Sequence, residues 1–408
     1  MAMAASAQRL SDEEPISCPA AGSLSEIGHL WYTNDPVGEK KRFGTIRECD
    51  SSATAEAVRL RSVRIGLIIP QRGSAGLWAP SAEACGRLAV TELNRAAGIR
   101  RRPVELLVID GGATGTSAGR AARDAVDELA VDGLVGMLPS YARDPVAKAA
   151  RGRVPFVYTP QFEGLTSNSD VMTTGETADE LLAPAIHWLS EFKRARRFFL
   201  CGNDYIWPRS SLQIAKRLIA RFGGTVTGEC YVPVGVHDYD EMLDRIKTTR
   251  SDVVLPVFLG FDCIAFSRAF CAAGLSRHVL RFSSAFDETI VYGLDSSETE
   301  NVFVASSYFA AVRSRNNGAF LERYYTAFGD NPPPANGYGE SCYEGIHALA
   351  ALIERAESFD AREIRRFYGR TLQGRTARGN EAQPVVGGRH PIHLAELDGY
   401  DFAVVASR

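Results

Sequence analysis

Short apolar runs alternate with segments of helical spacing along the chain from Val63 onward. The runs VRIGLIIP, PVELLVID, GLVGML and VPFVYT are typical of strands, because they are largely apolar and are bounded by turn residues. In the segments between them, apolar residues recur at helical spacing, which predicts helices over Ala79–Ala97, Ser117–Leu129 and Ala142–Ala150. This β-α alternation predicts a parallel sheet that is covered by helices on both faces.

The alternation restarts near residue 180, which predicts a second lobe of the same kind. Its expected strands are RRFFLCG, TVTGECYVP, DVVLPVFLG, VLRFSSA and NVFVASSYF, and its expected helices are Glu180–Phe192, Ser210–Phe222, Asp238–Thr248 and Cys263–Ala273. Further helices are expected over Asn317–Phe328, Ser341–Ala356 and Asp360–Leu372, before an antiparallel meander of QPVVGG, HPIHLAEL and YDFAVVAS. We therefore predict an α/β protein with two Rossmann-like lobes, each with a parallel sheet, and C-terminal antiparallel strands.

The changes of pattern also suggest domain boundaries. Residues 1–61 are rich in Pro, Ser and mixed charge, and we expect an irregular N-terminal extension there. Lobe 1 is predicted to hold residues 62–182 plus 307–378, and lobe 2 to hold residues 183–306 plus 379–408.

Charge and composition narrow the function classes. The 408 residues carry 46 Lys and Arg against 49 Asp and Glu, a formal charge of −3, so nothing favours direct nucleic-acid binding. The most apolar stretches, such as residues 252–261, fall short of the roughly 20 residues that span a bilayer. The N-terminus shows no basic region followed by an apolar segment, so we expect a cytoplasmic protein. The eight cysteines form no C-x-x-C pair and are expected to be reduced.

The motifs of common enzymes are missing. The sequence has no G-x-x-x-x-G-K-[ST] loop and no G-x-G-x-x-G turn, so we expect no nucleotide or other cofactor. His390 and His393 are the nearest histidine pair, but three positions apart on a strand they point to opposite faces, so no metal site is expected. Gly339-Glu340-Ser341-Cys342-Tyr343 approaches a serine-hydrolase elbow but lacks its final glycine. Ser341 is instead expected to cap a helix, and we predict no catalytic residues.

The loops after the predicted strands carry the candidate binding residues. In open parallel sheets, ligands bind at the carboxyl ends of the strands, near helix N-termini. Here those loops include LPSY, YTPQFEG, GNDYIWPR and SSAFDE, which are rich in Tyr, Trp, Phe, Gln and Ser. Aromatic walls with a few hydroxyl and amide groups favour a small, polar and uncharged ligand.

The residues from Val63 to Gly112 resemble the opening of the type I periplasmic-binding-protein family, of the leucine/isoleucine/valine-binding kind. The likeness lies in the first strand, its Pro-x-x-Gly turn, the Gly-x-x-Leu-Ala-x-x-x-x-Asn helix and a strand ending in Asp. YTPQFEG and GNDYIWPRSS are similar to loops of the cytoplasmic amide sensor that regulates bacterial amidase and nitrile hydratase operons. Urea and short-chain-amide transporters have related binding proteins. The resemblance covers about 85% of the chain and implies two lobes joined by three crossovers.

The resemblance also implies ligand-binding residues. Ser140 matches a serine that binds the amide, Tyr158 matches a pocket tyrosine, and Tyr205 matches a tyrosine that hydrogen-bonds the ligand. Gln161 stands where the family has a proline carbonyl, and Trp207 takes another aromatic position. Leu138 replaces a pocket tyrosine. From its place after a strand, Glu288 is a further candidate, although an exposed acid there is usually solvated.

The resulting hypothesis is a ligand-operated clamp that closes by hinge motion over a small neutral amide or a urea-like compound. The resemblance implies that closure controls a regulatory partner, an RNA-binding antitermination protein held silent until amide binds. The first alternative is the substrate-binding protein of an ABC transporter for urea, short-chain amides or branched-chain amino acids. The second is an amidohydrolase that uses Ser341 or Glu288. The sequence leaves open whether the chain forms a homo-oligomer.

Overall fold

The computed structural model describes residues 61–164, 168–368, 372–373, 376–378, 384–386 and 390–408. The predicted N-terminal extension lies outside the described residues, apart from its last residue. None of the helices in the described part of the chain is long and apolar enough to span a membrane.

A five-stranded parallel sheet lies in the first half of the chain, with the strand order β2-β1-β3-β4-β5. Its strands are β1 (Val63–Ile69), β2 (Val104–Asp110), β3 (Gly133–Gly136), β4 (Phe156–Tyr158) and β5 (Val171–Thr173). Its helices are η1 (Ser74–Trp78), α2 (Ala79–Arg95), α3 (Gly115–Asp127) and α4 (Ser140–Ala150). The later helices are α10 (Arg315–Phe328), α11 (Gly337–Ala356) and α12 (Ala361–Arg365), and α11 packs against α2 and β3.

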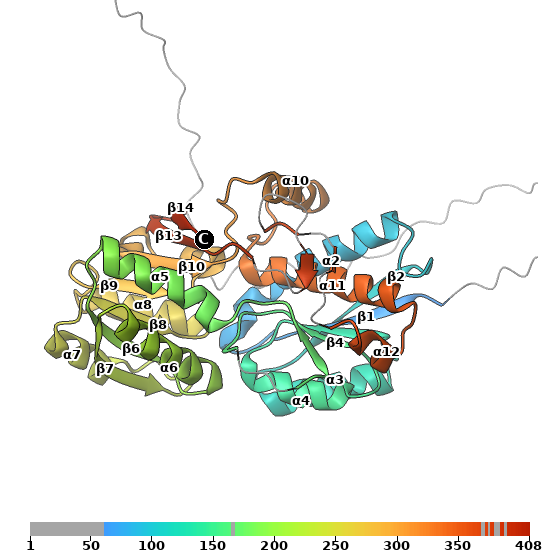
Figure 1. The fold of residues 1–408 in the computed structure, drawn as a ribbon, viewed down its shortest axis with the longest axis horizontal. Helices are drawn as coiled ribbons and strands as arrows, with labels where there is room; N and C mark the ends of the chain where they lie inside the picture. The colour runs from blue at the N-terminus through green and yellow to red at the C-terminus, as the bar shows by residue number, and fades with distance from the viewer. Residues whose placement is uncertain (1–60, 165–167, 369–371, 374–375, 379–383, 387–389) are drawn as a thin grey trace, which may run out of the picture. The chain divides into compact units, whose positions relative to one another are not determined.

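Both faces of this first sheet are buried. Ile65 and Leu67 of β1 belong to the same core cluster as residues of α2 and α11, whereas Ile68 packs with residues of α3 and α4. Successive strand residues point to opposite faces, so an almost unbroken apolar run is what a strand covered on both sides requires. Figure 1 shows α2 and α11 on one side of the strands and α3 and α4 on the other.

A seven-stranded mixed sheet holds the second group of strands, in the order β14-β13-β10-β9-β8-β6-β7. These are β6 (Arg197–Asn203), β7 (Thr225–Val232), β8 (Val253–Val257), β9 (Leu280–Ser283), β10 (Val302–Ser306), β13 (His393–Asp398) and β14 (Asp401–Ser407). The first five pair in parallel, while β13 runs antiparallel to both β10 and β14. The helices are α5 (Ala178–Phe192), α6 (Ile206–Arg221), α7 (Asp240–Thr249), α8 (Phe261–Ala272), α9 (Glu288–Tyr292) and η2 (Ser296–Thr299).

This second sheet repeats the two-sided burial of the first. Phe198 and Leu200 of β6 pack in a cluster with α5 and α6, and the intervening Phe199 and Cys201 pack with residues of α7 and α8. The predicted fold class, α/β with two parallel-sheet lobes and antiparallel C-terminal strands, is confirmed.

The C-terminal meander is only partly as predicted. β13 and β14 form an antiparallel pair, but Pro384–Val386 (β12) pairs with Leu372–Gln373 (β11) in a separate two-stranded sheet. The helix expected over Asp360–Leu372 is also shorter, because α12 ends at Arg365.

Two helices begin four residues earlier than the sequence predicts, and both starts border the site. Helix α6 begins at Ile206 rather than Ser210, so Tyr205 is its N-cap residue and Trp207 lies in its first turn. Helix α11 begins at Gly337, and Asn336 caps it by accepting a hydrogen bond from the Gly339 amide. The expectation that Ser341 caps this helix is therefore wrong.

Candidate functional site

Loops at the carboxyl ends of strands from both sheets enclose a cavity that we call the aromatic cavity. It is lined by Ala75, Trp78, Met137, Leu138, Pro139, Ser140, Tyr158, Pro160, Gln161, Tyr205, Trp207, Leu259 and Tyr338. The lining brings together Ser140, Tyr158, Gln161, Tyr205 and Trp207, which the sequence proposed as binding residues. Not one of the lining side chains is charged.

Ser140 and Tyr158 form a polar corner in this cavity. Ser140 is the first residue of α4, and its Oγ lies 3.5 Å from the hydroxyl of Tyr158. The Tyr158 hydroxyl donates to the carbonyl oxygen of Leu138 over 2.7 Å. Burial raises the pKa of Tyr158, so the phenol keeps its proton. Because the phenol donates its proton to the Leu138 carbonyl, the phenol oxygen can accept a hydrogen bond from a ligand. The Ser140 hydroxyl can rotate and donate to a ligand.

Tyr205 and Trp207 form the aromatic wall that comes from the second sheet. Tyr205 follows β6 and has an extended backbone, and its ring lies edge-on to Tyr141, with 5.4 Å between the ring centroids. The ring of Trp207 is 6.2 Å from that of Tyr205 and is buried. Their position follows from the early start of α6, where Pro208 is tolerated because first-turn amides need no intrahelical partner.

Gln161 bridges the two groups of loops. Its Nε2 donates to the carbonyl oxygen of Ser284 over 2.5 Å and to the hydroxyl of Tyr338 over 3.1 Å. Gln161 follows β4 of the first sheet, and Ser284 follows β9 of the second. With both amide hydrogens engaged, the side-chain carbonyl oxygen of Gln161 remains as an acceptor at the cavity wall.

Glu288 does not line this cavity, and it is buried rather than exposed. Only 5% of the residue is exposed, and its Oε1 accepts a hydrogen bond from the Ala310 amide over 2.7 Å. Burial and the neighbouring Asp287 raise the pKa of Glu288 to about 8. Glu288 follows a strand, where acids are usually exposed, but the backbone at residue 310 covers it and keeps it buried.

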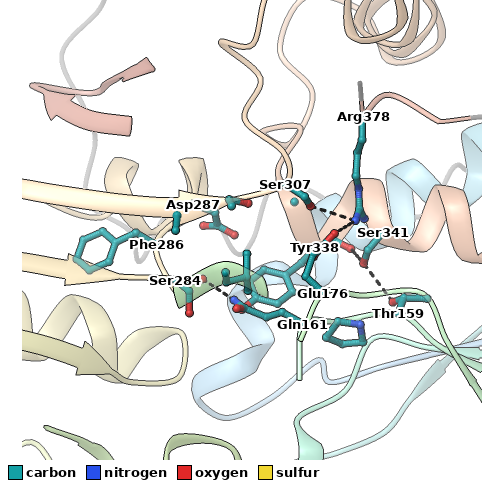
Figure 2. A pocket seen from close by; sticks show the side chains of 15 residues that line it. Thr159, Gln161, Glu176, Ser284, Phe286, Asp287, Ser307, Tyr338, Ser341 and Arg378 are labelled. Carbon is teal, nitrogen blue, oxygen red and sulfur yellow. Dashed lines mark hydrogen bonds and ion pairs between the residues drawn. The ribbon is translucent and has the colours of Figure 1, made fainter. Parts of the chain in front are cut away.

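A second, more polar space adjoins the aromatic cavity, and we call it the polar chamber (Figure 2). It is lined by Thr159, Pro160, Gln161, Glu176, Leu181, Ser284, Phe286, Asp287, Ala305, Ser306, Ser307, Gly337, Tyr338, Ser341 and Arg378. Pro160, Gln161 and Tyr338 belong to both linings, so the two spaces are neighbours.

Asp287 is one of several polar residues of this chamber that the sequence did not single out. Its Oδ1 accepts from the Ile290 amide over 3.0 Å, while Oδ2 is buried. Burial raises the pKa of Asp287 to about 7, even though the Trp78 side chain is a neighbouring donor that lowers the pKa of this carboxyl.

Tyr338 and Trp78 also line the cavity, and their ring centroids lie 4.1 Å apart. Neither was proposed as a binding residue, although the sequence places Trp78 in the loop after the first strand. Tyr338 belongs to the run GYGES, which includes Ser341. In that run, the Ser341 hydroxyl donates to the Tyr338 carbonyl over 2.7 Å, as a hydroxyl inside a helix does, and its Oγ lies 3.1 Å from Thr159 Oγ1. Within the described residues, no group of three or more His, Cys, Asp or Glu could hold a metal ion.

The comparison with protein families decides the assignment. A model described as periplasmic binding protein matches residues 62–382. The chain belongs to the periplasmic binding protein family. The proteins of this family bind ligands and are not enzymes, which supports the expectation that the chain has no catalytic residues.

Solved structures show the same periplasmic-binding-protein fold at low sequence identity. A branched-chain amino acid transporter substrate-binding protein from Streptococcus pneumoniae, in complex with isoleucine, matches with a TM-score of 0.73 at 17% identity, over 85% of this chain and 99% of that one. A solute-binding protein of an ABC transporter from Rhodopseudomonas palustris, in complex with 3,4-dihydroxybenzoic acid, matches with a TM-score of 0.74 at 17% identity, over 85% and 97%. A transporter substrate-binding protein from Sphaerobacter thermophilus matches with a TM-score of 0.71 at 19% identity, over 85% and 98%.

Proposed function

We propose that this periplasmic binding protein takes up a small, uncharged ligand with N–H donors, of the amide or urea type, in the aromatic cavity. The observation that carries the proposal is the lining itself, in which every side chain is neutral. A zwitterionic amino acid or a carboxylate would leave its charge without an opposite partner in this cavity, at a high desolvation cost.

The size of the cavity agrees with a small ligand. It contains about 20 Å³ in which the centre of a water-sized molecule fits. One buried water requires roughly 10–15 Å³ on this measure. The cavity therefore has room for one or two water-sized molecules, which favours a compact ligand such as urea or acetamide over an amino acid or a benzoate.

The polar groups around the cavity match an amide. The Ser140 hydroxyl and the amides at the start of α4 can donate to the ligand carbonyl. The phenol oxygen of Tyr158 and the side-chain carbonyl of Gln161 can accept from its NH₂ group. Asp287 offers one more acceptor for a ligand that extends into the polar chamber.

The similar solved structures favour one biological role for the ligand-bound protein, which is delivery of its substrate to an ABC transporter. A second candidate is a cytoplasmic amide sensor that controls an RNA-binding regulatory partner. The observation favouring it is that YTPQFEG and GNDYIWPRSS, the loops similar to those of amide sensors, supply Gln161, Tyr205 and Trp207 to one cavity.

The ligand proposal can be tested through the fluorescence of Trp78 and Trp207, which line the cavity. Ligand-stripped protein would be titrated with acetamide, propionamide, urea, leucine and 4-hydroxybenzoate. We expect saturable quenching or enhancement with the neutral amides or urea. Saturation by leucine or 4-hydroxybenzoate alone would refute the ligand class.

The two roles are separated by locating the protein and its partner. Transporter delivery predicts that the protein is found outside the cytoplasm and that cells lacking it lose uptake of labelled amide. The sensor role predicts a cytoplasmic protein that co-purifies with a regulator and releases it when amide is added. A regulator that stays bound at saturating amide would contradict the sensor mechanism.

A further inference from the structure

A buried group of charged residues lies at the wall of the polar chamber, and we call it the hinge cluster. It consists of Arg378, Glu176, Glu340, Glu344 and His390. The side chain of Arg378 is only 2% exposed, and those of Glu340 and Glu344 are fully buried. Charged side chains are rarely buried this deeply unless they are paired.

Arg378 is the centre of the hinge cluster. Its Nε donates to Glu340 Oε2 over 2.7 Å and lies 3.5 Å from Glu344 Oε2. Its Nη1 donates to Glu176 Oε1, donates to Ser307 Oγ over 3.1 Å, and lies 3.1 Å from His390 Nδ1. Figure 2 shows the Arg378 side chain reaching down to Ser307 at the chamber wall.

These partners belong to all three places where the chain passes between the sheets. Glu176 lies between β5 and α5, in the first crossing. Ser307 follows β10, in the second crossing. Arg378 and His390 both precede β13, in the third crossing. Glu340 lies on α11, which packs against the first sheet.

Packing of the two sheets does not by itself require one arginine to contact residues of all three crossings. Each crossing could be held by its own backbone contacts, yet one guanidinium reaches the other two crossings and the helix beneath them. Hydrogen bonds between ionised, buried groups are the strong ones, and removing one partner leaves the others unpaired.

We propose that Arg378 is a positioning residue that fastens the three crossings to one another at the wall of the polar chamber, so that they open together rather than singly. The inference does not depend on which ligand the cavity takes.

The charges of the hinge cluster make this fastening sensitive to pH. The groups facing His390 are Arg378, Glu176 and Glu344, and Glu340 completes the cluster. Burial and Arg378 oppose protonation of His390, but Glu344 and Glu176 outweigh them and its pKa is raised. Burial and the Glu344 charge raise the pKa of Glu340 to about 8. Burial alone would raise the pKa of Glu176, but Arg378 and His390 hold it well below its usual range.

The raised pKa values of His390 and Glu340 mean that the hinge cluster becomes less stable as pH rises. A raised pKa means that the folded cluster holds protons that the unfolded chain has released, so the stability from His390 and Glu340 is lost as pH rises through their folded pKa values. Three carboxylates would then face the single charge of Arg378. The Glu340 contribution falls from its ordinary pKa near 4.5 up to its folded pKa of about 8, and that of His390 is lost above its ordinary pKa of 6.5, so the crossings are expected to loosen as pH rises through about 8.

Hydrogen exchange of the ligand-free full chain tests the proposal. Peptides covering residues 174–178, 306–308 and 376–378 report the three crossings, and peptides of β1 and β6 serve as internal references. In Arg378→Lys, which keeps the charge but loses the planar fork, we expect exchange to rise about tenfold in all three crossings together. Arg323→Lys is the matched control, because Arg323 pairs with Glu92 away from the crossings.

A second variant, Glu340→Gln, tests the pH dependence, because glutamine is uncharged like the protonated acid and has nearly the same size. After correction for intrinsic exchange rates, the wild type is expected to exchange faster at pH 8.5 than at pH 6.5 in the crossings, and Glu340→Gln is expected to lose most of that difference. Faster exchange in the third crossing alone for Arg378→Lys would overturn the proposal. An equal pH difference in the wild type and Glu340→Gln would overturn the pH-dependent part.

Discussion

The Gln161 side chain donates from Nε2 to the carbonyl oxygen of Ser284 over 2.5 Å, and this bond joins the end of β4 in one sheet to the end of β9 in the other. The same nitrogen donates to Tyr338, which lines both the aromatic cavity and the polar chamber. One amide thus ties together the two groups of loops around the proposed ligand.

Replacing Gln161 by Leu should weaken ligand binding by about 1–3 kcal/mol, because the cavity loses the bridge to Ser284 and the amide acceptor. The check is a titration with acetamide, with thermal unfolding measured in parallel. Gln213→Leu on the exposed face of α6 is a control that leaves the cavity untouched. Wild-type affinity in Gln161→Leu would show that this bridge plays no part in binding.

Ser140→Ala and Tyr205→Phe each remove one hydroxyl from the proposed site. We expect each change to reduce affinity for a small amide by about 1–3 kcal/mol, the cost of leaving a buried polar ligand group unpaired. Ser210→Ala, on the outer part of α6, is the control for a serine outside the cavity lining. If both cavity variants bind like the wild type, the ligand lies elsewhere.

Tyr158→Phe should reduce stability as well as affinity. The phenol donates to the Leu138 carbonyl in a fully buried position, so its loss leaves that carbonyl without this partner. The expected cost is about 1–3 kcal/mol in the free energy of unfolding, measured by urea denaturation. An unchanged unfolding midpoint would mean that water replaces the lost hydroxyl.

The buried acids Asp287 and Glu288 should make the protein less stable at alkaline pH. Burial raises their pKa values to about 7 and about 8, so the folded chain holds protons that the unfolded chain releases at lower pH. Their contribution is full below the unfolded pKa near 4 and is lost as pH rises through about 7 to 8. Glu288→Gln should therefore raise the melting temperature relative to the wild type at pH 9. An identical pH profile in the two proteins would contradict this.

Gly260 should resist substitution because of a close approach between the loops. It has a φ of +45°, and a Cβ there would meet the carbonyl oxygen of Ser74 at 1.7 Å. Gly260→Ala is therefore expected to force the loops after β1 and β8 apart and to reduce ligand affinity. Gly318→Ala is the control, since a Cβ at Gly318 meets no atom within 4 Å. Equal affinity in both variants would show that this contact is dispensable.

The sequence predicted the two sheets well because their inner strands, such as β1 and β6, are buried on both faces. Residues such as Ile65 and Ile68 face different helices, so the strand has to be apolar throughout, and this pattern is visible without a structure. The loop residues of the aromatic cavity were also accessible, because the ends of parallel strands meet at one edge and their loops carry the aromatic and hydroxyl groups.

The errors came from contacts between residues that are distant in sequence. Glu288 was a candidate binding residue, with a solvated surface acid as the alternative, and nothing local shows that it is buried and accepts from the Ala310 amide. Its neighbour Asp287 faces the polar chamber, and the two acids look alike in the sequence. The start of α11 was misplaced because the glycines of the run NGYGES disfavour helix, while the side chain of Asn336 caps it.

The hinge cluster was beyond prediction for the same reason. Arg378 lies 202 residues from Glu176 and 71 from Ser307, and no spacing rule joins them. The pairing of β11 with β12 likewise replaced the expected three-stranded meander through a contact that periodicity does not encode.

The central claim, that the aromatic cavity binds a small neutral N–H donor, is tested most directly by calorimetric titration of ligand-stripped protein. Acetamide and leucine would be titrated in parallel into the wild type and into Ser140→Ala. We expect acetamide to bind the wild type with one site per chain and to bind the variant more weakly, and leucine to give no heat of binding. Tight binding of leucine, with acetamide silent, would contradict the account and mark the protein as an amino-acid binder.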